Sequence, residues 1–139
     1  MKKHRLVITT IFTFLISLAA FPGSANAGTE QQIKDWTFLV FINGHNNLDS
    51  FGAMNIKQME EVGSNDKMNI VVQWASLSNG NTKRLYVQKS TNPNAVTSPV
   101  VQDMAPVDMG DYNELVKFVE WGAKNYPAKH YFVAVCRIS

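Results

Sequence analysis

The sequence predicts an α/β fold, specifically an incomplete doubly wound sheet that is mostly parallel and carries an appended β-hairpin. Two segments with helical spacing of apolar residues, 48–62 and 111–126, separate three short apolar runs. Runs without polar alternation are typical of strands covered on both faces, and strand, helix and strand in succession form a right-handed parallel crossover. The three predicted buried strands are Trp36–Ile42, Met68–Trp74 and His130–Cys136.

The first of these strands is expected to lie in the middle of the sheet and to end in a polar loop, Asn43–Asn47. Open α/β sheets bind their ligands beyond the carboxyl ends of the strands. The alternative is that the asparagine side chains only satisfy the backbone of the loop and cap the following helix. The candidate binding residues are Asn43, His45, Asn46 and Asn47.

The first predicted helix, Leu48–Val62, has start and stop signals at its two ends. Asp49 or Ser50 can cap its first turn, and Gly63 stands just past its end. Glu60 and Glu61 near that end indicate a solvated face. The apolar residues expected near one face are Phe51, Met54, Met59 and Val62.

The second predicted helix, Asp111–Tyr126, begins with Asp111 and Glu114 in a pattern similar to a capping box, and Pro127 ends it. Asp108, Asp111 and Glu114 match no calcium loop, so helix capping is preferred to a cation site. No metal site is expected. The apolar face of this helix comprises Leu115, Phe118, Val119, Gly122 and Tyr126.

Between the helices the sequence predicts an antiparallel hairpin. The Asn79-Gly80 pair is a strong turn signal before the strand candidate Thr82–Gln88. A second candidate, Val96–Met104, contains Pro99, which restricts it to a sheet edge or a bulge.

The first 27 of the 139 residues have the layout of a secretory signal peptide, with cleavage after Ala27. The apolar run Leu6–Phe21 is about 16 residues, fewer than a membrane span needs. We therefore expect a secreted or periplasmic protein, with residues 28–139 forming the α/β domain and no stable membrane insertion after cleavage. The formal charge of +2 becomes −1 without the leader's three basic residues, which disfavours nucleic-acid binding.

Cofactor and nucleophile motifs are absent from the sequence. No G-x-G-x-x-G or P-loop follows a strand, so no nucleotide cofactor is expected. Cys136, the single cysteine, permits no intramolecular disulfide. His130 lies six residues before it on the same predicted strand, about 20 Å away, so the two residues cannot form a catalytic pair.

The segments, taken in order, resemble the clostripain family of secreted cysteine endopeptidases. The resemblance implies a caspase-like α/β fold, peptide or protein substrates, and a His–Cys dyad. The family's histidine lies in a His-Gly pair just after the third strand, and its cysteine follows the next strand. The matching segments are 36–37 through 46–48, 59–64, 69–73, 82–84, 108–111, 115–121 and 125–131.

The resemblance ends at Cys136. The His-Gly pair would fall on Ile138-Ser139, so no catalytic residue is carried over, and His45 replaces an acidic residue expected before the asparagine pair. We therefore expect a truncated, inactive amino-terminal fragment, produced by a shifted reading frame and lacking its carboxyl-terminal half. The alternatives are a natural non-enzymatic secreted module that binds a peptide or protein at its exposed sheet edge, and a hydrolase that uses Cys136.

Overall fold

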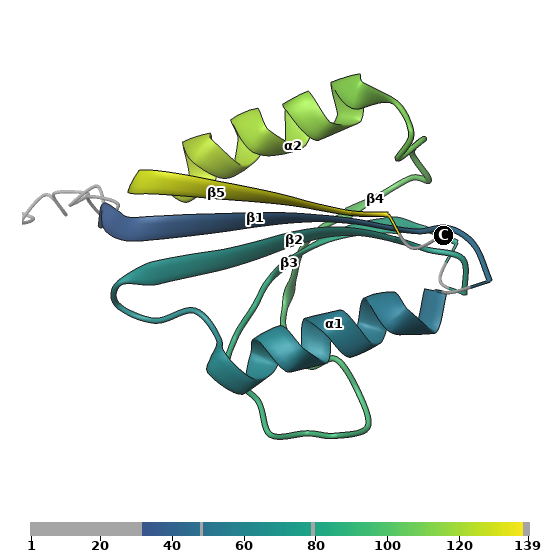
Figure 1. Ribbon diagram of the computed structural model, residues 1–139, viewed down its shortest axis with the longest axis horizontal. Helices are drawn as coiled ribbons and strands as arrows, with labels where there is room; N and C mark the ends of the chain where they lie inside the picture. Colours follow the sequence, from purple (N-terminus) through teal and green to yellow (C-terminus); the bar gives the residue numbers. More distant parts are fainter. Residues whose placement is uncertain (1–31, 48, 79, 138–139) are drawn as a thin grey trace, which may run out of the picture.

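The computed structural model describes residues 32–47, 49–78 and 80–137, so the predicted leader lies outside the described residues. Helices α1 (Asp49–Val62) and α2 (Tyr112–Asn125) cover opposite faces of one sheet (Figure 1). In the described ranges, neither helix has the length and apolar character needed to cross a membrane. The strands are β1 (Lys34–Gly44), β2 (Met68–Ser76), β3 (Thr82–Tyr86), β4 (Val100–Met104) and β5 (Ala128–Arg137).

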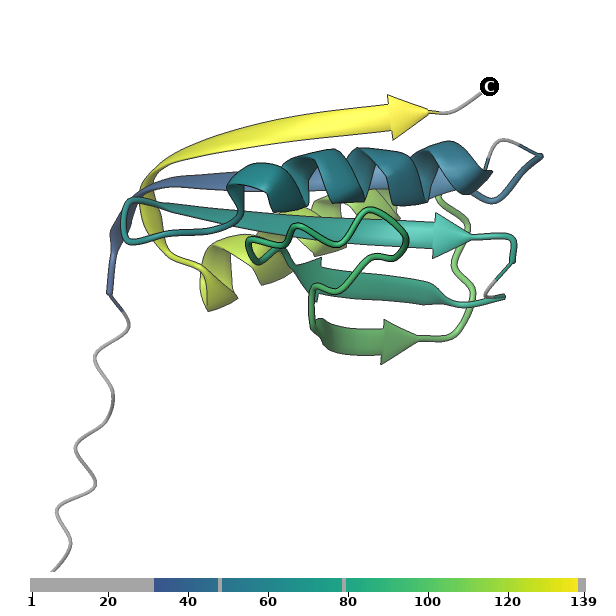
Figure 2. The same ribbon diagram turned by 90° about the horizontal axis from the view of Figure 1, so that it is seen from below.

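The sheet order is β4-β3-β2-β1-β5 (Figure 2). Strands β1, β2 and β5 are parallel, whereas β3 and β4 extend the sheet as an antiparallel hairpin. The predicted α/β class, the mostly parallel sheet and the appended hairpin are therefore confirmed. The strand predicted as Val96–Met104 begins only at Val100, so Pro99 directly precedes it rather than lying inside it. The predicted edge position is confirmed, and the β3–β4 register also shifts between Arg84 and Leu85.

Strand β1 lies between β2 and β5, as predicted, and its side chains alternate between two cores. Val40 and Ile42 point to the α1 side, and Leu39 and Phe41 point to the α2 side. The α1-side core also contains Ile56, Ile70, Val72, Trp74, Leu85 and Val87, and the α2-side core contains Val71, Ala75, Met109 and Phe118.

Helix α2 packs on the sheet through the face that the sequence predicts. Asp111 caps its start, where its carboxylate accepts the backbone N–H of Asn113 at 2.9 Å. Phe118 and Gly122 are buried, and a β-carbon at Gly122 would overlap the side chain of Leu39. The glycine therefore allows the helix to approach β1 closely.

Arg84 links the hairpin to α2. Its guanidinium lies 4.4 Å from the ring centroid of Trp121, and its Nε donates to Gln73 Oε1 at 2.8 Å. Burial lowers the pKa of Arg84, and the charge of Glu114 partly opposes this shift. The cation is thus held by an aromatic face and amide oxygens inside the protein.

The apolar face predicted for α1 is wrong for three of its four residues, whereas Met59 packs against the α1-side core as predicted. Phe51, Met54 and Val62 are 46%, 44% and 58% exposed, whereas the helix buries Gly52, Ile56 and Glu60. The close approach of Gly52 to Trp74 decides this orientation, because a β-carbon at Gly52 would lie 2.6 Å from the indole Nε1. The apolar spacing identifies the helix but not the side that meets the sheet.

The prediction that Glu60 belongs to a solvated face is also wrong, although Glu61 is exposed as expected. Glu60 is only 1% exposed. Its Oε1 accepts the backbone N–H groups of Thr97 and Ser98 at 2.8 and 2.7 Å and the Ser98 hydroxyl at 2.6 Å. Its carbonyl also accepts the N–H of Ser90 at 2.8 Å. The segment that joins β3 to β4 is thus fixed to the end of α1.

Strand β5 is not the buried strand that its apolar run predicts. It forms an edge of the sheet, and its larger apolar side chains are between 41% and 58% exposed. A strand is fully buried only where it has a neighbouring strand on each side and a helix on each face. Within the described residues, α2 packs on one face of β5, and on the other face only Ala134 and Cys136 pack against the α1-side core. The exposed side chains are Tyr131, Phe132, Val133 and Val135.

Replacing Glu60 with alanine is expected to destabilise the fold by about 3 kcal/mol, because three donors lose their buried acceptor. Urea unfolding followed by circular dichroism measures the change. Glu61→Ala is the matched control and should change stability by less than about 0.5 kcal/mol. Equal effects of the two substitutions would contradict the role assigned to Glu60.

Candidate functional site

The carboxyl ends of the three parallel strands meet at one edge of the sheet. The register pairs Gly44 of β1 with Ser76 of β2, and Asn43 of β1 with Arg137 of β5. The loop that follows β1 therefore begins between the ends of its two neighbours, at the edge where β5 also ends (Figure 1). This is the position at which open α/β sheets bind ligands.

Three of the four candidate binding residues, His45, Asn46 and Asn47, lie in the short turn between β1 and α1, whereas Asn43 lies within β1, which extends two residues beyond the predicted strand end at Ile42. Asn43 Oδ1 accepts the backbone N–H of His45 at 3.4 Å, and the Asn46 carbonyl accepts the N–H of Asp49 at 3.2 Å. The side chain of Asn43 thus satisfies a backbone N–H of the loop, which agrees with the alternative to a binding role. The side chains of His45 and Asn47 are exposed to solvent.

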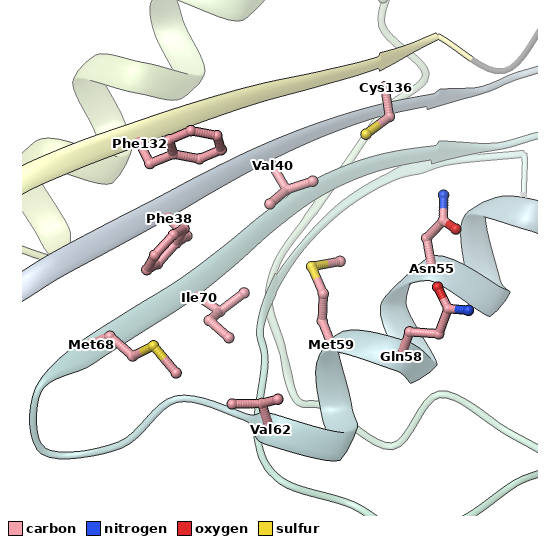
Figure 3. Close-up of a pocket in the computed structure, with 10 residues that line it drawn as sticks. All are labelled: Phe38, Val40, Asn55, Gln58, Met59, Val62, Met68, Ile70, Phe132 and Cys136. Atoms are coloured by element: carbon pink, nitrogen blue, oxygen red, sulfur yellow. The ribbon is translucent and has the colours of Figure 1, made fainter.

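His130 and Cys136 lie at opposite ends of β5, which agrees with the expectation that they form no catalytic pair. The register places His130 beside Trp36, with 4.9 Å between the ring centroids, and Cys136 beside Ile42. Cys136 lines an apolar groove next to α1 (Figure 3). No group of three or more potential metal-binding side chains occurs in the part of the chain that the structure describes.

Asp49 is the main residue near the carboxyl ends of these strands whose role sequence analysis missed. We expected it only as a cap of α1, but its Oδ2 accepts the Ser76 hydroxyl at 2.8 Å. The same oxygen accepts the backbone N–H and the hydroxyl of Ser78 at 3.0 and 2.6 Å. Asp49 therefore joins the start of α1 to the end of β2. These partners lie 27 and 29 residues away, so no local sequence signal shows them.

The environment of Asp49 favours its charged form. Burial by itself raises the pKa of this carboxyl, but hydrogen bonds from Ser78 and Ser76 outweigh burial and hold the pKa below the ordinary value of 3.8. The loop between β1 and α1 thus has a fixed negative charge at its base.

Gly44 packs tightly beside this carboxylate. A β-carbon at Gly44 would lie 2.9 Å from the Ala75 carbonyl oxygen, 3.1 Å from Trp74 Nε1 and 3.2 Å from Asp49 Oδ1. Within the described residues, these Trp74 and Asp49 atoms are buried without a hydrogen-bond partner. The glycine therefore keeps the loop close to the end of β2.

Residues 40–136 match the model of the clostripain family, peptidase family C11. The chain belongs to the clostripain family. The match includes the loop after β1 and the whole of α1, β2 and α2. It ends at Cys136, before the two positions on which the family's His-Gly pair would fall.

Solved structures of clostripain-family proteases have the same fold. A cysteine protease of B. fragilis has a TM-score of 0.62 and 17% identity, with 77% of this chain and 91% of that chain covered. A Bacteroides thetaiotaomicron clostripain, solved with a peptide inhibitor, has a TM-score of 0.62 and 12% identity, with 78% and 94% covered. The predicted caspase-like α/β architecture is thereby confirmed. No curated protein sequence matches the chain.

A third solved clostripain-family structure is a much longer chain. The secreted C11 cysteine protease of Bacteroides thetaiotaomicron, in complex with an irreversible peptide inhibitor, has a TM-score of 0.58 and 23% identity. The alignment covers 74% of this chain but only 29% of that protease. The shared fold therefore makes up nearly all of two solved chains but less than a third of this longer one.

Asp49→Asn should destabilise the protein by roughly 2 kcal/mol near neutral pH, because charge-assisted hydrogen bonds from two serines are weakened. The folded-state pKa is lowered, so the stabilisation is present above about pH 4 and is lost as the pH falls through the folded-state value. Urea unfolding at about pH 7 and about pH 3 measures the difference.

The exposed Asp66→Asn variant is the control, and its stability should match the unsubstituted chain at both pH values. A deficit of Asp49→Asn that persists undiminished at low pH would contradict an electrostatic role for this carboxylate.

Proposed function

We propose that this chain is the amino-terminal portion of an exported clostripain-family cysteine endopeptidase and that it does not hydrolyse peptides alone. The supporting observation is the family match over residues 40–136, on a sheet whose edge strand is β5. By the resemblance, the dyad histidine follows this strand and the dyad cysteine follows the next one. Proteolysis then requires a carboxyl-terminal part that supplies both residues.

In the complete enzyme, the loop after β1 would form one wall of the substrate cleft. Asn43 pairs with Arg137 at the end of β5, and by the resemblance the family's histidine follows this strand. Amide and imidazole groups can bind the backbone of an extended peptide, and Asp49 holds the loop in place from behind. The residues assigned to this wall are Asn43, His45, Asn46 and Asn47. Peptide inhibitors in two solved relatives support a peptide substrate.

Export is part of the proposal. The layout of residues 1–27 favours cleavage after Ala27, and one solved relative is described as secreted. The domain would then comprise residues 28–139 and act in the periplasm or outside the cell.

A non-enzymatic module that binds peptide or protein is the second candidate. The exposed apolar side chains of β5 favour it, because an unpaired sheet edge can accept an added strand. The two candidates differ in one respect: the fragment gains activity when the remaining domain is present, whereas the module binds peptide and never hydrolyses it.

Two experiments test the proposed function. First, the encoding DNA is sequenced past the codon for Val135 in all three frames, and any long form with a His-Gly pair and a later cysteine is expressed. Second, hydrolysis of a fluorogenic peptide library is measured for the long form and for the present chain. We expect activity only in the long form and its loss when the later cysteine is replaced by alanine.

For the present chain, peptide hydrolysis should equal the buffer background, and Cys136→Ala should change nothing. Hydrolysis by the purified chain that disappears in Cys136→Ala would contradict the proposal and support the Cys136 hydrolase. If no frame continues the family pattern, peptide binding without hydrolysis would support the binding module.

A further inference from the structure

We draw no further inference here: the strongest candidate, the groove that lies beside α1 on the β1–β5 pair, is an unpartnered apolar face, and nothing in the structure shows what covers it.

Discussion

The two-sided pairing of β1 is the constraint on which the rest of the structure depends. Its backbone is bonded to β2 on one side and to β5 on the other, and its side chains enter both cores. Four successive apolar residues, Leu39–Ile42, are buried on both faces of the strand, which is possible only inside a sheet covered on both sides. The position of β1 fixes the faces that α1 and α2 cover, and it places the loop after Gly44 between two strand ends.

The central position of β1 also explains why the β2 side of the sheet is buried and the β5 side is exposed. Around β2 the sheet, α1 and the hairpin segment enclose a continuous core that includes Trp74 and Leu85. Around β5 the same kinds of side chain face solvent, because no strand lies beyond it and one face lacks a helix among the described residues. Apolar runs of the same kind on the two sides of β1 are therefore buried in β2 but only partly buried in β5.

The sequence was sufficient to predict the elements because each depends on local signals. Apolar runs identify the strands, Asp111 and Gly63 mark helix ends, and Pro99 indicates the edge strand. Contacts between distant residues were not predictable in this way. Glu60 is buried because Thr97 and Ser98 donate to it, and Asp49 is anchored by Ser76 and Ser78.

Two further features differ from the sequence-based expectation because they also depend on contacts between distant residues. The orientation of α1 depends on the fit of Gly52 against Trp74, which no helical period encodes. The exposure of β5 depends on what lies beyond it rather than on its own apolar residues. At the candidate site, the sequence located the loop after β1, but the carboxylate at its base required the folded structure.

Residue-resolved amide hydrogen exchange, measured by NMR on the full chain, tests most directly the claim that β1 is central and that β5 is an open edge. Amides of β1 within the segment 38–42 should exchange slowly throughout, at rates set by opening of the whole domain. Along β5, slow and fast amides should alternate, since only one side of the strand is bonded. Uniformly slow exchange along β5 would show that this edge is already paired and would contradict the account.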